Sequence, residues 1–168
     1  MLHDSGQLCY SFFLPFSFDE RLRDINMSWL VVFEFIQKAL SSFGLELDFH
    51  KPCDFAVGNR KICGNSSRRG LHGTLIHGTI LLSSDVWRFP RYLNHPSDEP
   101  EYRRGRGHTE FVTTLEQLGV YVSRSRLIEE ILKSIGNHEM VKLPGRLSAA
   151  ARDLIVVKYS RDEWNLKM

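Results

Sequence analysis

The alternation of hydrophobic and polar positions predicts strands early in the 168-residue chain and helices before and after them. Leu8–Leu14 is apolar and aromatic and is closed by Pro15, which is typical of a strand. Asp19–Ser42 repeats apolar residues at three- and four-residue steps, which predicts a helix with Asp19 as N-cap and Gly44 as C-terminal stop. The apolar face of this helix comprises Leu22, Ile25, Trp29, Val32, Phe33, Ile36 and Leu40.

The middle of the chain is rich in strand-forming residues. Leu45–Phe49 alternates like a short strand, and Phe55–Val57 followed by Arg60–Gly64 predicts a hairpin that turns at Gly58-Asn59. Leu71–Leu82 predicts a longer strand.

The second half of the chain is mainly helix and loop. The predicted segments are a short helix at Asp85–Leu93, a loop at Asn94–Gly107, a helix at Ser125–Ile135, a connector at Ile135–Gly145 and a last helix at Leu147–Tyr159. Clustered strands with helices on both sides predict one α+β domain over residues 1–168 rather than a regular βαβ series.

Composition narrows the class of protein. Hydrophobic residues make up 42% and charged residues 25%, as in ordinary globular proteins. A net charge of +2 is too small to indicate a nucleic acid or an anionic membrane as partner, and we expect neither. No secretory signal is evident, and no apolar stretch approaches the roughly 18 residues of a membrane helix. The three cysteines form no CxxC pair, so we expect a reduced, cytoplasmic setting.

Lys61 is the strongest candidate for chemistry. It follows the apolar run Phe55–Val57 and lies between Gly58 and Gly64, where ligand and backbone can approach closely. A lysine ammonium offers three donors and a point charge, so it can contact a carboxylate and a phosphate at once. The alternative is an ordinary solvated lysine beside a hairpin turn.

Several segments, taken in order, resemble the biotin/lipoate A/B protein ligase family, most closely its lipoate-protein ligases. Asp54–Asn65 is similar to the family stretch that runs from an acidic residue through Gly-x-(Arg/Lys)-Lys to Gly-Asn or Gly-Ser, and His77-Gly78-Thr79 follows it. Pro100–Leu115 resembles the later PxYR…R.H..F.TNL segment, and Lys158–Asn165 resembles the KY…EWN ending. Leu2–Phe12 looks like the end of the family's glycine-rich GGG(A/T)V.HD.G.L.YS segment.

The resemblance implies a catalytic domain of the class II synthetase and biotin/lipoate ligase type, with a mixed, mostly antiparallel sheet flanked by helices. It implies that ATP and Mg²⁺ activate lipoate or octanoate to an acyl-AMP. The acyl group would then pass to a lysine of a lipoyl acceptor domain, in a 2-oxoacid dehydrogenase complex or the glycine cleavage H protein. Lipoate is favoured over biotin because of Pro100–Leu115.

The resemblance also implies roles for individual residues. Lys61 would bridge the acyl carboxylate and the α-phosphate, and Asp54 would serve the nucleotide, plausibly through Mg²⁺. His3 would belong to the wall of the acyl pocket. The other residues expected to bind substrate or nucleotide are Gly64, Asn65, His77 and Gly78.

Some residues allow a second interpretation. Asp54 could be a simple turn carboxylate, and His77 could be a core histidine with satisfied hydrogen bonds. Arg103, Arg104 and Arg106 form either a solvated loop or a patch that faces the nucleotide or the acceptor. Apolar contacts for a medium-length acyl chain could come from Phe12, Leu75 and Ile80.

Two other functions stay open. The Arg-Arg-x-(Ser/Thr)-Gly-Gly-Gly stretch of the family does not precede Leu2, so we expect a catalytic domain without its N-terminal strands. Such a chain could be a non-catalytic fragment or a partner subunit that binds the acceptor domain. Alternatively, it could take octanoyl from a carrier protein without ATP. Cys53 would then be the nucleophile, unless it is only a small packed residue.

Overall fold

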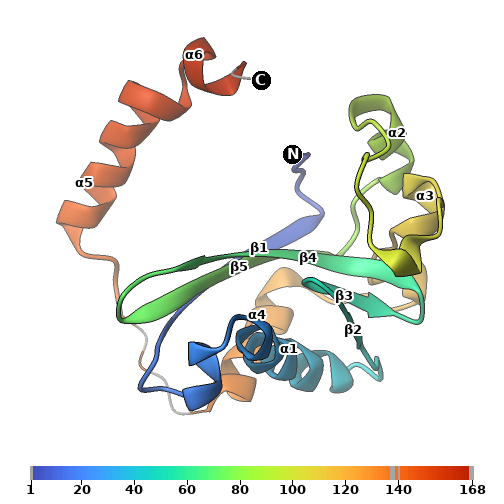
Figure 1. Ribbon diagram of the computed structural model, residues 1–168, viewed down its shortest axis with the longest axis horizontal. Coiled ribbons are helices and arrows are strands. Elements are labelled where there is room, and N and C mark those ends of the chain that lie inside the picture. Colours follow the sequence, from blue (N-terminus) through green and yellow to red (C-terminus); the bar gives the residue numbers. More distant parts are fainter. Residues whose placement is uncertain (1, 137–138, 140, 167–168) are drawn as a thin grey trace. The chain divides into compact units, whose positions relative to one another are not determined.

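The computed structural model describes residues 2–136, 139 and 141–166 (Figure 1). These residues divide into two compact units, residues 1–136 and 137–168. The predicted connector Ile135–Gly145 includes residues 137, 138 and 140, which lie outside the described residues. Within the described part, no helix is both long and apolar enough to cross a membrane.

A five-stranded sheet with the order β1-β5-β4-β3-β2 forms the centre of the first unit. Its strands are β1 (Gln7–Pro15), β2 (Asp48–His50), β3 (Asp54–Val57), β4 (Arg60–Arg69) and β5 (Gly73–Leu81). All four pairings between neighbouring strands are antiparallel. The predicted hairpin is confirmed, and Gly58 takes the left-handed φ of 58° at its turn. The short strand predicted at Leu45–Phe49 begins at Asp48 instead, and Leu45 and Leu47 before it are buried in the core.

Two helices cover one face of this sheet. Figure 1 shows α1 (Ile25–Ser41) and α4 (Arg124–Ile135) side by side below the strands. The fully buried side chains of this core include Val32, Ile36, Leu40, Phe55, Ile62, Ile76, Ile80, Leu115 and Leu127. Burial of this apolar surface is the main force that holds the helices on the sheet.

The first predicted helix is divided in the structure. Asp19 caps a short 3-10 helix, η1 (Glu20–Arg23), whereas Asp24 is the N-cap of α1. Asp24 has an extended backbone, and its side chain accepts from the backbone N–H groups of residues 26 and 27. The prediction that Ile25 faces the core is wrong, because this first helical residue is 53% exposed.

Single helical turns build the other side of the unit, beside the β3–β4 hairpin. They are η2 (Val86–Arg88), α2 (Phe89–Tyr92), η3 (Glu101–Arg103), α3 (His108–Phe111) and η4 (Glu116–Leu118). The short helix predicted at Asp85–Leu93 is confirmed as η2 and α2, and the predicted loop at Asn94–Gly107 contains η3. A second apolar cluster, with Val86, Phe89 and Phe111 at its centre, holds these turns together.

The second unit contains α5 (Gly145–Leu154), a π-helical turn η5 (Ile155–Tyr159) and α6 (Asp162–Asn165). The predicted last helix therefore begins two residues earlier than expected and changes its winding at Ile155. Lys158 Nζ lies 4.0 Å from the ring centre of Trp164, and the Tyr159 ring packs edge-on against the same tryptophan. The KY…EWN residues thus form a local cluster.

Candidate active site

A cavity of about 590 Å³ is lined by residues of β1, β4 and β5 and of the β3–β4 hairpin. Its size falls within the usual range of small-molecule sites. Seven residues that the sequence predicts for catalysis or binding lie in its wall: His3, Asp54, Lys61, Gly64, Asn65, His77 and Gly78. The register of the sheet accounts for this gathering, since Asn65 pairs with Gly78 and Gly78 pairs with Tyr10.

Lys61 and Asp54 form an ion pair in this wall. Lys61 Nζ lies 2.6 Å from Asp54 Oδ1, and the two side chains are 28% and 7% exposed. The register between β3 and β4 shifts between Phe55 and Ala56. Gly64 leaves room for the ammonium, because a Cβ there would lie 3.0 Å from Lys61 Cε and 3.1 Å from Nζ. The pair is neutral overall, and it holds the ammonium donors of Lys61 at a defined place in the cavity wall.

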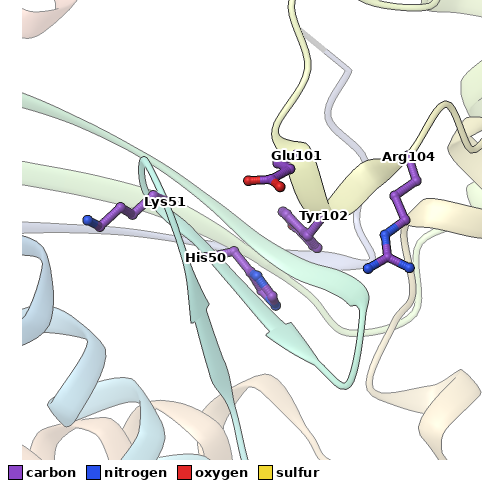
Figure 2. Close-up of a pocket in the computed structure, with 5 residues that line it drawn as sticks. All are labelled: His50, Lys51, Glu101, Tyr102 and Arg104. Carbon is purple, nitrogen blue, oxygen red and sulfur yellow. The ribbon is translucent and has the colours of Figure 1, made fainter.

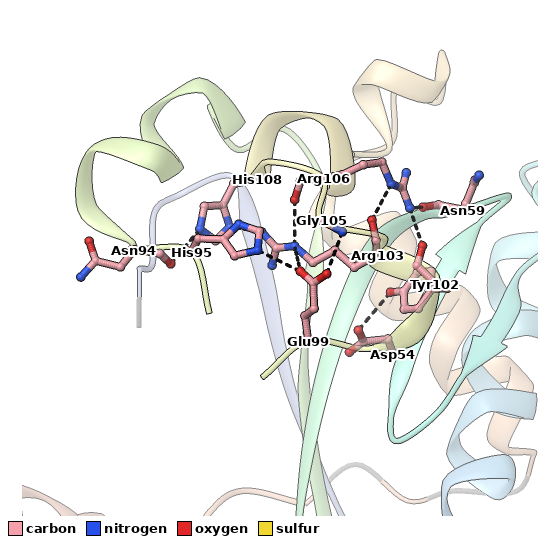
Figure 3. Close-up of polar contacts among 10 residues, drawn as sticks. All are labelled: Asp54, Asn59, Asn94, His95, Glu99, Tyr102, Arg103, Gly105, Arg106 and His108. Carbon is pink, nitrogen blue, oxygen red and sulfur yellow. Dashed lines mark hydrogen bonds and ion pairs between the residues drawn. The ribbon is translucent and has the colours of Figure 1, made fainter. Parts of the chain in front are cut away.

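The second oxygen of Asp54 is also occupied. The Tyr102 hydroxyl donates to Asp54 Oδ2 over 3.0 Å (Figure 3). Each carboxylate oxygen carries two lone pairs, so these two contacts leave part of the acceptor capacity of Asp54 unused. Within the described residues, no group of three or more potential metal ligands gathers anywhere. The expected Mg²⁺ site at Asp54 stays a prediction.

Asn65 belongs to a buried polar cluster at the edge of the cavity. The Tyr10 hydroxyl donates to Asn65 Oδ1, and Asn65 Nδ2 donates to the Cys53 carbonyl over 2.7 Å. Burial raises the pKa of Tyr10 well above its ordinary value, so its hydroxyl stays a donor. Any side chain at Gly78 would collide with this pair. Gly78 is thus required by close packing, and sequence reasoning did not identify Tyr10.

The two predicted histidines lie on different segments of the wall. His3 Nδ1 is 3.0 Å from Gln7 Oε1 and 3.8 Å from Cys9 Sγ. Asp4 fixes this segment, because its carboxylate accepts from the Gly6 N–H and the Ser84 hydroxyl. His77 is exposed in the middle of β5, so it is not a buried core histidine.

The three cysteines differ in accessibility although all of them line the cavity. Burial raises the pKa of Cys63 to about 12. Cys53 is half-buried, its thiol donates to the Asn65 carbonyl over 3.0 Å, and burial raises its pKa. Both thiols are therefore poor sources of thiolate at neutral pH. Cys9 is exposed.

The apolar part of the cavity wall differs from the prediction. Among the described residues, the wall is made apolar by Leu2, Leu81, Phe89 and Val112. Ile80 is fully buried and Phe12 packs against the main core instead. Leu81, Phe89 and Val112 belong to the second apolar cluster, which the strand pattern alone does not locate.

The three arginines do not form one basic patch. Arg103 is 4% exposed, donates to the Arg106 carbonyl over 2.9 Å and pairs with Glu99. Arg106 donates to the carbonyls of Asn59 and Tyr102 (Figure 3). Arg106 thus fastens the loop to the β3–β4 turn at Asn59, whereas Arg103 holds the loop together from inside.

Arg104 alone is exposed, and it lines a smaller cavity of about 280 Å³ together with His50, Lys51, Glu101 and Tyr102 (Figure 2). Because Tyr102 lines this cavity and also contacts Asp54, it lies beside the larger cavity.

Comparisons with known proteins find a matching family model, similar sequences and similar folds. A family model described as "Lipoyl protein ligase A/B catalytic domain" matches residues 1–136, which is the whole first unit. An octanoyltransferase LipM of Kyrpidia tusciae is 26% identical over 194 aligned positions, which cover 99% of this chain and 70% of that protein.

Two solved structures show the same fold. A lipoate-protein ligase A bound with ATP aligns with a TM-score of 0.79 and 21% identity, over 97% of this chain and 66% of that one. A bi-partite lipoate protein ligase of Thermoplasma acidophilum, described with its E2 lipoyl domain, aligns with a TM-score of 0.77 and 21% identity. That match covers 97% of this chain and 65% of the other, so the chain spans about two thirds of each solved ligase.

Proposed function

Because the chain belongs to the lipoyl protein ligase A/B catalytic domain family, we propose that it activates lipoate or octanoate with ATP and attaches the acyl group to a protein lysine. The observation that carries this proposal is the Lys61 ammonium, held 2.6 Å from Asp54 in the wall of a ligand-sized cavity. The family membership confirms the resemblance seen in the sequence, and the activity is our inference from the site.

The proposed reaction has two steps. A carboxylate oxygen of the acyl acid attacks the α-phosphorus of ATP, and pyrophosphate leaves. The amine of the acceptor lysine then attacks the acyl carbonyl, and AMP leaves as the new amide forms. Both steps concentrate negative charge between the carboxyl group and the α-phosphate. Lys61 would meet this charge with the donors that Asp54 does not use, and preorganised donors of this kind are usually a large part of catalysis.

The remaining residues would shape the site around that charge. Gly64 would keep the space of the Lys61 ammonium open, and Asn65 with Gly78 would hold the packed strand pair below the ligand. His3 and His77 would contact the acyl group or the nucleotide from the wall. Mg²⁺ would arrive as the magnesium complex of ATP, and Asp54 is the residue expected beside it.

The expected acceptor is a lipoyl domain of a 2-oxoacid dehydrogenase complex or the glycine cleavage H protein. The solved ligase described with its E2 lipoyl domain supports the first of these, and the ligase solved with ATP supports the nucleotide.

A lipoylation assay on the full chain tests the proposal. Purified protein, ATP, Mg²⁺, an apo lipoyl domain and either lipoate or octanoate are incubated, and the acceptor is weighed by intact mass spectrometry. We expect one acyl addition, lost by about a hundredfold or more in Lys61→Ala. Lys38→Ala, which removes an exposed lysine of α1, is the matched control and should behave like wild type.

The proposed function is wrong if folded wild-type protein, checked by circular dichroism, transfers neither acyl group. Equal rates in Lys61→Ala and wild type would instead remove Lys61 from the reaction while leaving the activity.

A second candidate is transfer of octanoyl from a carrier protein without ATP. The relative that aligns over 99% of this chain is an octanoyltransferase, which favours it. Geometry then favours Cys9 over Cys53, because Cys9 is exposed and lies 3.8 Å from His3 Nδ1. The Cys9 thiolate would attack the carrier thioester, and the carrier thiolate would leave and take up the proton that Cys9 had released. The acceptor lysine amine would then attack the Cys9 thioester, and the Cys9 sulfur would leave with the proton of that amine. Transfer from octanoyl-carrier protein without ATP that is lost in Cys9→Ser and kept in Cys53→Ser would support this candidate.

A partner subunit is the third candidate, and one solved neighbour is described as a bi-partite ligase. Binding of the apo acceptor domain by calorimetry, with no transfer of either acyl group from any donor, would support this role.

A further inference from the structure

Two groups hold the Asp54 carboxylate, and they come from different parts of the chain. Lys61 Nζ lies 2.6 Å from one oxygen, and the Tyr102 hydroxyl donates to the other over 3.0 Å. Asp54 is 5% exposed, so water has little access to replace either partner. The direction of the carboxylate, and with it the position of the ammonium, depends on the phenol.

Tyr102 is itself tightly anchored. Its ring stacks on His50, with 3.8 Å between the ring centres and 8° between the ring planes. Both side chains are drawn in Figure 2. The ring also packs against Phe111 at 5.0 Å, and Arg106 donates to the Tyr102 carbonyl over 2.9 Å. Burial and the Asp54 charge raise the Tyr102 pKa, which keeps the hydroxyl a donor. The ring contacts with His50 and Phe111 and the hydrogen bond from Arg106 to the Tyr102 carbonyl thus hold the phenol in its orientation toward Asp54.

The segment that carries Tyr102 also holds the Lys61 backbone. The Thr113 N–H donates to the Lys61 carbonyl over 2.9 Å, and Arg60 Nη2 donates to the Val112 carbonyl over 3.1 Å. Lys61 and Val112 form an isolated parallel bridge. Residues 102–113 thus fix both the main chain of Lys61 and its counter-ion.

We propose that Tyr102 is a positioning residue that holds the Lys61 ammonium at its catalytic place by orienting Asp54. Tyr102 does not line the larger cavity and acts through the carboxylate. The consequence for turnover rests on the proposed function, whereas the consequence for the mobility of Lys61 does not.

Kinetics of Tyr102→Phe test the consequence for turnover. This variant keeps the ring and its stacking on His50 and removes only the hydroxyl. A hydrogen bond to a charged group justifies an expected fall of about tenfold in kcat, with KM for lipoate changed by less than about twofold. Tyr121→Phe, which removes an 81% exposed hydroxyl of the same kind, should leave both constants unchanged.

Lysine labelling tests the mobility of Lys61 without any activity. The protein is treated with an amine-acylating N-hydroxysuccinimide ester, and peptides containing Lys61 and Lys38 are quantified by mass spectrometry. Tyr102→Phe should label Lys61 at least about threefold faster, because one holder of its counter-ion is gone, while the exposed Lys38 stays constant. In an Asp54→Asn background the Tyr102→Phe change should add almost nothing, since the two side chains act as one unit.

Each outcome decides the inference. If wild type transfers the acyl group, an unchanged kcat in Tyr102→Phe, or a change in KM alone, overturns it. If wild type transfers nothing, the proposed function fails, and labelling alone decides: an equal Lys61 labelling rate in wild type and Tyr102→Phe overturns the inference, whereas faster labelling that Asp54→Asn abolishes supports it.

Discussion

At the scale of single residues, the site depends on the absence of a side chain at Gly64 as well as on the side chain of Lys61. Gly64 lies opposite the Lys61 ammonium, and a Cβ there would lie 3.0 Å from Lys61 Cε and 3.1 Å from Nζ, so the ammonium would have to shift by a few tenths of an ångström. The neighbour that must move is the flexible end of the Lys61 side chain. A small side chain at position 64 would therefore lower the free energy of unfolding only slightly. Even this small shift would alter the 2.6 Å contact between Lys61 Nζ and Asp54 Oδ1.

Gly64→Ala should therefore lower acyl transfer by about tenfold or more while changing the free energy of unfolding by less than about 1 kcal/mol. Transfer rates and urea unfolding of the same preparations measure the two effects. Gly107→Ala is the matched control, because a Cβ there meets no atom within 4 Å. Full activity in Gly64→Ala would show that the ammonium tolerates displacement.

At this scale the sequence predicts Lys61 as a site residue, and the structure places Lys61 in the cavity wall beside Asp54, whereas the sequence does not predict the contact of Tyr102. The glycines around Lys61 are visible in one short segment, and a strand pairing brings Asp54 beside it. Tyr102 lies 48 residues from Asp54, and only the fold brings the two together. The PEYR resemblance was the signal for Tyr102, but it carries no information about which atom the phenol contacts.

At the scale of elements, the hydrophobic pattern predicts whether a segment is helix or strand better than it predicts the residues at which the segment begins and ends. Asp19 and Asp24 both precede the apolar repeat of the first helix, and each caps a different helix. The pattern cannot separate them, because both side chains suit an N-cap. The extended backbone of Asp24 decides which residue begins α1.

Asp24→Ala should lower the midpoint of thermal unfolding by about 2–4 °C at neutral pH. Backbone hydrogen bonds from Met27 and Asn26 lower the Asp24 pKa below its ordinary value of 3.8. The benefit is present above that value and is lost as pH falls below it, so the two proteins should converge in acid. Asp98→Ala in the exposed loop is the control, and the same fall there would argue against a capping effect.

At the scale of the whole molecule, the fold class followed from the sequence and the strand order did not. Clustered strands between helices indicated an α+β domain, and the family resemblance indicated an antiparallel sheet. The pairing of β1 with β5 depends on long-range contacts that no local pattern reveals. The arrangement of α1 and α4 on one face likewise emerges only when their apolar sides meet the sheet.

Stability at high pH tests the burial of Cys63, whose thiol lies 3.3 Å from the Tyr10 hydroxyl in the polar cluster at the edge of the cavity. Cys63 has a pKa raised from 9.0 to about 12, so the folded state keeps a proton that the unfolded chain releases. Stability is therefore full below pH 9 and falls as pH rises toward 12. We expect Cys63 to contribute a loss of about 1 kcal/mol between about pH 9 and 10, and urea unfolding of wild type and Cys63→Ala should show it as a shallower pH dependence in the variant. Identical slopes would place the thiol in a more solvated environment.

The hydrogen bond from the Thr113 N–H to the Lys61 carbonyl makes the opening of the site measurable by hydrogen exchange. Thr113 is fully buried, so its amide proton exchanges with deuterium only when residues 102–113 separate from β4. The exchange rate of this one proton reports how often the site opens, with no ligand and no turnover. A ligand that bridges Lys61 and its neighbours should slow that exchange. The exchange rate of the Thr113 amide would then report whether the cavity is occupied.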